Sequence, residues 1–196
     1  MANLIALSAY KEMTGITSTN QDTRITALIQ SVSQLVKTYC NNSFKDFVSD
    51  AKTEVFNVDY GEHFVQLTET PLIAINSVSE REKPTDSYTA LTDGTDYYAD
   101  SVTDTIFRLD SGGNEKSFKS GKGAVKVVYT AGYSTLPQDL ELAVMDLITY
   151  YLKDERKQRQ TIAGASLNNQ PSTSQRDNVG FPDHIKRVLD LYKNYG

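Results

Sequence analysis

The sequence of 196 residues predicts an α+β fold, in which helices from both ends of the chain form a bundle and an antiparallel β unit is inserted between them. Three observations predict it. Apolar residues recur at helical spacing between positions 25 and 39, short strand-like runs fill the section from about 50 to 131, and helical spacing returns at Pro137. We therefore expect a single domain over residues 1–196, with helices at about 8–41 and 137–195.

The N-terminal section contains two expected helices. Ser8 is a candidate N-cap for a short helix that Gly15 ends, and Asn20 is a candidate N-cap for a longer one. The longer helix has one apolar face, made of Ile25, Leu28, Ile29, Val32, Leu35, Val36 and Tyr39. It ends near Cys40, the single cysteine, which excludes an intrachain disulfide and indicates a buried thiol.

The middle section alternates between short apolar runs and turn residues. Strands are expected at 55–58, 64–67, 72–78, 88–91, 97–99, 105–109 and 124–129. Asp93-Gly94 predicts a tight turn that joins two of these runs, 88–91 and 97–99, into a hairpin. Such short connections favour an antiparallel arrangement, and the free strand edges that it leaves favour pairing between copies of the chain.

The C-terminal section returns to helix. Pro137 is a favoured first-turn residue, and the apolar face that follows it consists of Leu140, Ala143, Val144, Leu147, Ile148 and Tyr151. Residues 164–180 are rich in Gly, Ser, Asn, Gln and Thr, which predicts a mobile loop at about 160–181. Pro182 then opens a last helix, whose apolar face is Ile185, Val188, Leu189 and Tyr192.

Charge and composition restrict the function. The net charge is −5, and residues 48–131 hold 8 basic and 14 acidic side chains. This balance argues against a protein that grips nucleic acid by counterion release, although DNA could still pass its surface without binding. No signal peptide begins the chain, and no apolar run approaches the roughly 20 residues that a bilayer requires, so we expect no membrane contact. The twelve tyrosines suit protein interfaces, because the ring is apolar and its hydroxyl can stay hydrated.

No motif predicts catalysis, a metal or a cofactor. Gly121-Lys122 resembles the end of a phosphate-binding loop, but Lys116 replaces the leading glycine and Gly123 replaces the hydroxyl residue that would bind magnesium. The aspartates at 93, 96, 100 and 104 lack calcium-loop spacing, and turn chemistry explains Asp93-Gly94. The two histidines lie in different sections.

One charged run leaves two interpretations open. Lys116, Lys119, Lys122 and Lys126 are spread across a Gly-rich loop and the following strand. Such lysines commonly protect a strand edge from aggregation. Alternatively, Lys116, Lys119 and Lys122 contact phosphates or an acidic partner surface.

Several phrases, in their order, resemble the head–tail connector family of tailed bacteriophages, also called adaptor or head completion proteins. They are MTGI at 13–16, YCNNSF at 39–44, LTETPLIAINSV at 67–78, LTDGTDYYAD at 91–100, YTAGY at 129–133 and LPQDL at 136–140. The resemblance implies a structural subunit with no catalytic residues and no cofactor. About twelve copies would form a ring in the neck of the virion, below the portal protein, after assembly in the host cytoplasm.

The resemblance also implies partners. The ring would extend the DNA channel, pass genomic DNA without specific binding, and dock the tail or a stopper protein. The segment from Ala163 and the helix residues Pro182, Ile185, Val188, Leu189 and Tyr192 would dock on the portal. Three alternatives stay open: another neck or tail ring component (a stopper or tail terminator), a nucleic-acid-binding module that uses the lysine run, and an uncharacterised enzyme.

Overall fold

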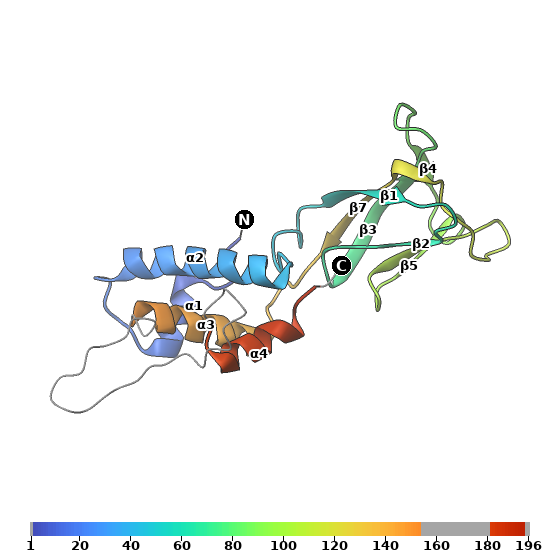
Figure 1. Ribbon diagram of the computed structural model, residues 1–196. Helices are drawn as coiled ribbons and strands as arrows, with labels where there is room; N and C mark the ends of the chain where they lie inside the picture. Colours follow the sequence, from blue (N-terminus) through green and yellow to red (C-terminus); the bar gives the residue numbers. More distant parts are fainter. Residues whose placement is uncertain (1, 154–180, 195–196) are drawn as a thin grey trace. The chain divides into compact units, whose positions relative to one another are not determined.

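The computed structural model describes residues 2–153 and 181–194 (Figure 1). The chain divides into two compact units. The helical unit is formed by Met1–Asn42 and Thr135–Lys193, and the β unit by Ser43–Ser134 with Asn194–Gly196. Helices from both ends of the chain and antiparallel strands from its middle confirm the predicted α+β class.

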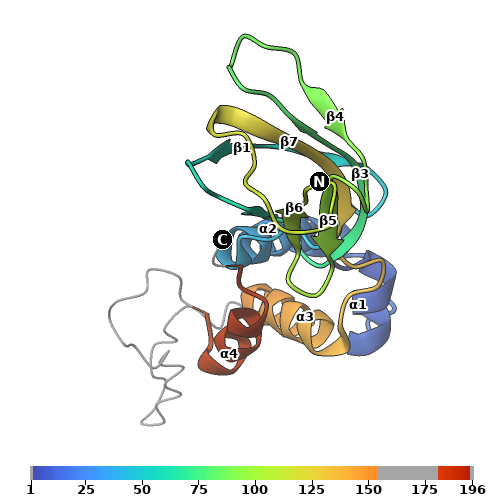
Figure 2. The ribbon, with the colours of Figure 1, turned by 90° about the vertical axis from the view of Figure 1, so that its right-hand side faces the viewer.

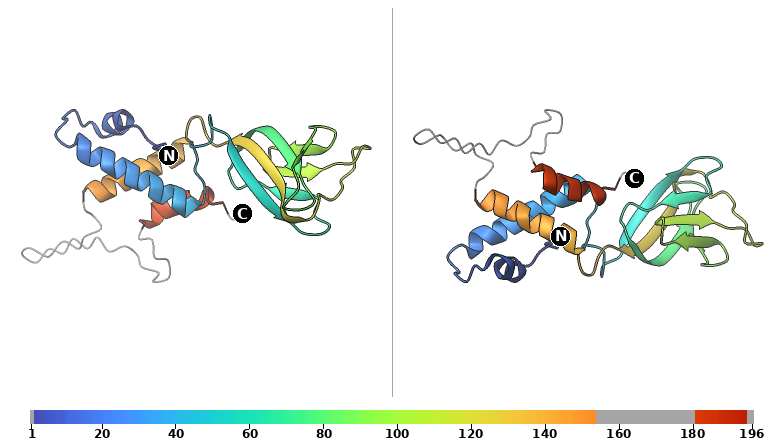
Figure 3. Two further views of the ribbon diagram at one scale, coloured as in Figure 1. Left: turned by 90° about the horizontal axis from the view of Figure 1, so that it is seen from above. Right: turned by 90° about the horizontal axis from the view of Figure 1, so that it is seen from below.

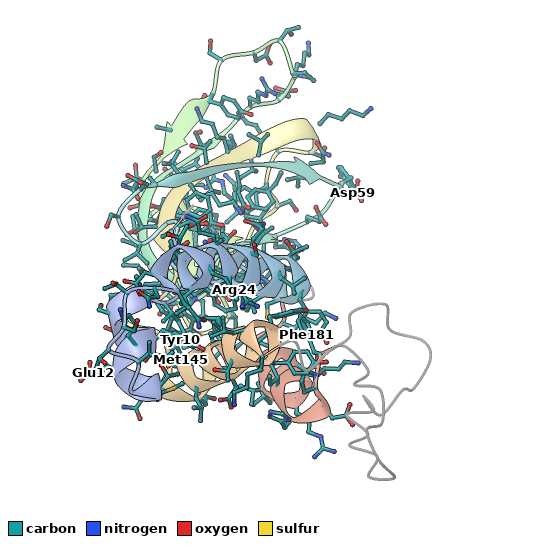
Figure 4. All side chains as sticks on the ribbon, turned by 90° about the vertical axis from the view of Figure 1, so that its left-hand side faces the viewer. Tyr10, Glu12, Arg24, Asp59, Met145 and Phe181 are labelled. Atoms are coloured by element: carbon teal, nitrogen blue, oxygen red, sulfur yellow. The ribbon has the colours of Figure 1, made fainter. Side chains whose placement is uncertain are left out.

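The helical unit contains α1 (Leu7–Thr14), α2 (Asp22–Cys40), α3 (Gln138–Leu152) and α4 (Asp183–Leu191). Helix α2 packs against the other three helices, and Figure 3 shows it crossing α3. Tyr10 of α1 is fully buried, and its hydroxyl lies 3.0 Å from Thr149 Oγ1 of α3; Figure 4 labels Tyr10 beside Met145, another buried residue of α3. The core therefore joins segments from both ends of the chain.

Neither predicted N-cap residue is a cap. Helix α1 begins after Ala6, so Ser8 lies inside it, and α2 begins after Gln21, one residue beyond Asn20. Neither helix has a side-chain cap hydrogen bond. Tertiary contacts set both starts instead: Leu4 and Ile5 are buried just before α1, and Lys11 Nζ lies 2.8 Å from Asp22 Oδ1 in the first turn of α2. The predicted stop at Gly15 is correct, because this residue has the left-handed conformation with φ 68°.

The predicted faces of α2 and α3 are largely correct. Every residue predicted for the two faces is buried or half-buried, and Met145 is an additional buried residue of α3. Pro137 is the N-cap of α3, and Pro182 is the N-cap of α4. Cys40 is buried as expected. Most of the expected loop at 160–181 lies outside the described residues, and Phe181 is the first described residue after the gap.

The β unit contains two antiparallel sheets (Figure 2). The four-stranded sheet has the order β1 (Lys52–Val58), β7 (Gly121–Ala131), β3 (Leu72–Glu80) and β4 (Thr89–Leu91). The three-stranded sheet has the order β2 (Phe64–Gln66), β6 (Thr105–Arg108) and β5 (Tyr97–Asp100). Side chains from both sheets form one buried core, which includes Val65, Leu67, Val78, Tyr97, Ile106, Phe118, Val125, Val127 and Tyr129.

The predicted hairpin around Asp93-Gly94 is wrong. Strand β4 pairs with β3, and β5 pairs with β6, so the two runs belong to different sheets. The turn itself exists: Gly94 has φ 69°, and Asp96 N donates to Thr92 O at 2.8 Å while Thr92 N donates to Asp96 Oδ2 at 2.9 Å. This compact turn carries the chain from one sheet to the other because Leu91 and Tyr97 are both needed in the core between them.

Candidate interaction surfaces

A polar network inside the β unit anchors the ends of this unit. Tyr129 is fully buried; its hydroxyl donates to Glu54 Oε2 at 2.9 Å and accepts from Glu69 N at 3.1 Å. Lys52 Nζ lies 2.7 Å from Glu54 Oε1 and 3.2 Å from Glu69 Oε1. Thr68 Oγ1 also donates to Glu54. Burial alone would raise the pKa of Glu54, but the Lys52 and Thr68 donors lower it below its ordinary value.

The same network holds both places where the chain enters the β unit. Ser43 donates to Glu69 Oε2 from its N at 2.9 Å and from its hydroxyl at 2.7 Å. Asn194 Nδ2 donates to Thr68 O at 2.6 Å. The network is therefore a structural anchor for the loop between β2 and β3, with its polar groups paired to one another.

A second buried charge joins the two sheets. Arg108 of β6 is 4% exposed, and its Nη2 lies 3.1 Å from Glu80 Oε1 of β3. Its Nη1 donates to the carbonyl oxygens of Asp96 at 2.5 Å and Leu109 at 2.8 Å. Among the described residues, every buried side-chain nitrogen and oxygen has a hydrogen-bond partner. The pair therefore fixes one sheet against the other.

The aspartates of the β4–β6 region are turn residues. Asp100 accepts from Val102 N at 2.9 Å, and Asp104 accepts from Leu72 N at 2.6 Å. Within residues 2–153 and 181–194, no group of three or more His, Cys, Asp or Glu side chains is arranged to hold a metal ion. The helices of this described part include none that is both long and apolar enough to cross a bilayer.

The residues predicted to dock on a portal divide between the core and the surface of the helical unit. Ile185 and Leu189 are buried, and Pro182 and Val188 are half-buried. Tyr192 is half-buried, and its hydroxyl donates to Asp139 Oδ1 at 2.6 Å. The outer face of α4 instead presents His184, Arg187 and Leu191, of which Leu191 is 77% exposed. The helical spacing detected the face that packs inward.

The three predicted loop contacts are all exposed. Lys116, Lys119 and Lys122 flank Phe118, which is buried in the core of the β unit. Lys116 N donates to Arg108 O at 2.9 Å, and Phe118 N donates to Glu62 O at 2.9 Å, so the backbone between the lysines is fixed. No described carboxylate lies within ion-pair distance of these three side chains.

The structure also shows a cation cluster that the sequence did not predict. Arg81 and Lys126 each lie 4.5 Å from the centroid of the Tyr88 ring. Lys126 is distant in sequence from Arg81 and Tyr88, and the pairing of β7 with β3 places it opposite Ser79, close to Arg81. A periodic pattern carries no signal for such a cluster.

Comparison with known proteins identifies the family. A family model described as head completion protein matches residues 3–195. The chain belongs to the head completion protein family. This membership confirms the resemblance found in the sequence.

One curated relative shares part of its sequence with this head completion protein. The head completion protein of Escherichia phage T5 is 30% identical over 77 residues, which are 39% of this chain and 42% of that protein. The match therefore spans less than half the length of either protein.

Solved structures share the fold over almost the whole chain. A protein from the neck of an empty gene transfer agent particle, computed with C6 symmetry, has a TM-score of 0.59 and 15% identity, covering 100% of this chain and 94% of that one. One from the native neck with C12 symmetry has a TM-score of 0.58 and 14% identity, covering 97% and 88%. A third, from the native virion, has a TM-score of 0.60 and 13% identity, covering 98% and 91%. At 13–15% identity, these matches show that the proteins share a fold.

Proposed function

We propose that this head completion protein is a non-catalytic ring subunit of a phage neck, which sits below the portal, extends the DNA channel and docks the tail or a stopper. The observation that carries the proposal is the fold match, over 97–100% of the chain, to proteins from particle necks computed with C6 and C12 symmetry. A ring requires head-to-tail contacts between copies, which a β unit with free strand edges is suited to supply.

Binding to a portal ring tests the proposal. Native mass measurement of the chain alone and mixed with its portal ring should give a complex that contains about twelve copies of the chain, matching a twelvefold ring. If the chain does not bind the portal but closes the end of a tail tube, it is a tail terminator. If it binds only to an already completed neck, it is a stopper.

The C-terminal segment is the proposed portal-docking element. The segment from Ala163 includes α4, whose inner residues Ile185 and Leu189 fill the core of the helical unit. A truncation after Ala163 should abolish portal binding, but it also removes part of this core. Leu191→Asp is therefore the matched variant, because Leu191 is 77% exposed and its replacement leaves the core intact. Unchanged portal binding by both variants would remove α4 and its preceding segment from the interface.

Transit of DNA without binding is the last part of the proposal. The β unit section carries 14 acidic and 8 basic side chains between residues 48 and 131, which disfavours tight phosphate binding. A filter assay with duplex DNA at physiological salt should give poor retention. Tight, salt-sensitive retention would favour the nucleic-acid-binding alternative.

A further inference from the structure

The cation cluster on the four-stranded sheet consists of Arg81, Tyr88 and Lys126. Because both cations lie 4.5 Å from one ring centroid, they are within about 9 Å of each other, close to the Debye length of about 8 Å at physiological salt. The two charges therefore repel each other. Neither has a carboxylate within ion-pair distance among the described residues.

The backbone around Gly123 is shaped to hold this cluster. Gly123 O accepts from Arg81 Nε at 2.9 Å and from Tyr88 Oη at 2.8 Å. Gly123 has φ 60°, and a Cβ there would lie 2.8 Å from Arg81 Nη2 and 3.2 Å from Val55 Cγ1. The positive φ favours glycine here, and a side chain at this position would displace the guanidinium. Val55 is paired with Lys126 and is 53% exposed, so an apolar side chain adjoins the two cations.

A surface of opposite charge, which also carries exposed apolar side chains, lies on the other sheet of the same unit. Strand β5 is an edge strand of the three-stranded sheet. Around it lie two carboxylates, Asp93 and Asp100, and two exposed apolar side chains, Tyr98 at 55% and Val102 at 88%. Hydrogen bonds from Val102 N and Thr103 lower the pKa of Asp100, which keeps its carboxylate charged. The cluster and this edge belong to different sheets: β4, which follows the Arg81–Tyr88 segment, is part of the four-stranded sheet, and β5 is part of the three-stranded sheet (Figures 1 and 2).

We infer that the cation cluster of one copy binds the acidic β5 edge of the next copy in the ring. The inference rests on the proposed function, since it names the contact by which the ring closes. Two different surfaces that complement each other in charge give head-to-tail association, whereas a self-complementary patch would give only dimers. The apolar neighbours, Val55 on one side and Tyr98 and Val102 on the other, exclude water from the ion pairs. The excess of acidic side chains in residues 48–131 disfavours binding of the DNA polyanion at the cluster.

The test uses the full-length chain and sedimentation velocity up to millimolar concentration, at low and at high salt. The wild type is expected to associate at low salt and to dissociate at high salt. Arg81→Glu/Lys126→Glu and Asp93→Lys/Asp100→Lys should each weaken association at least tenfold, because each pair of substitutions removes two close charge pairs. Lys116→Glu/Lys119→Glu is the matched control: it changes the net charge as much as the first variant but lies outside the cluster, and it should associate like the wild type.

Mixing the two weakened variants separates lost contact from lost folding. Each retains one native surface, and the reversed charges of the two altered surfaces also attract each other, so the mixture should regain the association that each variant alone has lost. No recovery of association in the mixture, equal weakening by the Lys116/Lys119 control, or a wild type that stays monomeric at millimolar concentration would overturn the inference. Duplex DNA binding by the wild type that Arg81→Glu/Lys126→Glu abolishes would also overturn it, because the cluster would then hold phosphates.

The portal assay distinguishes this inference from the proposed function. If the wild type and both charge variants load the portal ring equally, the neck function stands and the proposed contact between copies is wrong. If the wild type fails to load the portal ring, the neck function itself is wrong.

Discussion

Replacing Gly132 with alanine should destabilise the β unit more than replacing a positive-φ glycine whose added Cβ would meet open space. Gly132 follows β7 with φ 109°, a conformation that side chains rarely adopt. A Cβ at this position would overlap the carbonyl oxygen of Phe44, lie 3.0 Å from its carbonyl carbon, and lie 3.3 Å from Val48 Cγ2. The backbone cannot move away easily, because Gly132 N donates to Pro71 O at 2.8 Å and Tyr133 N donates to Phe44 O at 2.6 Å.

The cost has two parts. The backbone strain contributes about 1–3 kcal/mol, and the overpacking against the segment that follows α2 contributes about 1–3 kcal/mol more. A loss of about 4 kcal/mol would lower the melting temperature by roughly 8–16 °C for a chain of this size. Gly61→Ala is the matched control, because Gly61 has φ 90° but a Cβ added there would meet no other atom within 4 Å. It should lose only the strain part.

Differential scanning calorimetry is the assay, since the chain has no tryptophan for a fluorescence melt. Calorimetry also separates the two transitions if the compact units unfold independently. In that case, only the melting temperature of the β unit should fall. The reasoning is refuted if Gly132→Ala melts within the error of Gly61→Ala, because the close approach of Phe44 would then carry no energetic cost.

Three further outcomes follow from the buried groups. Tyr129→Phe removes one donor from Glu54, which keeps Lys52 and Thr68, and takes away the acceptor of the Glu69 amide. Urea unfolding should therefore show a loss of about 1–3 kcal/mol, whereas Tyr98→Phe on the exposed surface should change little. The pKa of Glu54 is lowered on folding, so its contribution to stability is complete above its ordinary value of 4.5 and is lost as the pH falls through the lowered value; the unfolding midpoint should fall less steeply in acid for Glu54→Gln than for the wild type. Burial raises the pKa of the Cys40 thiol to about 12, so a thiol reagent at about pH 8 should label it in urea and not in the folded chain; rapid labelling of the native protein would contradict the buried position.

The sequence predicted the helices and strands better than it predicted their connections. The faces of α2 and α3 were recognisable because side chains at positions such as Ile25 and Val144 repeat with the period of the helix itself. The strands that pair with β4 and with β5 were not recognisable. Asp93-Gly94 specifies a turn but does not determine which sheet the next strand joins.

The surface clusters were harder still to predict. The Arg81–Tyr88–Lys126 cluster depends on the register between β3 and β7, a long-range property that local patterns do not encode. Conversely, Ile185 and Leu189 formed a clear pattern, but a helical stripe cannot tell whether its apolar face meets its own bundle or another protein. The family resemblance supplied what local patterns could not, because the order of the phrases along the chain reflects the whole topology.

Strand β7 has a further consequence for synthesis. It pairs on one side with β1 and on the other with β3, although it is the last strand of the β unit to leave the ribosome. Until Ala131 has emerged, the nascent chain holds two strands with no central partner between them, and such unpaired strands are prone to aggregation. We therefore expect the yield of folded chain from an expression host to rise when chaperones are supplied in excess.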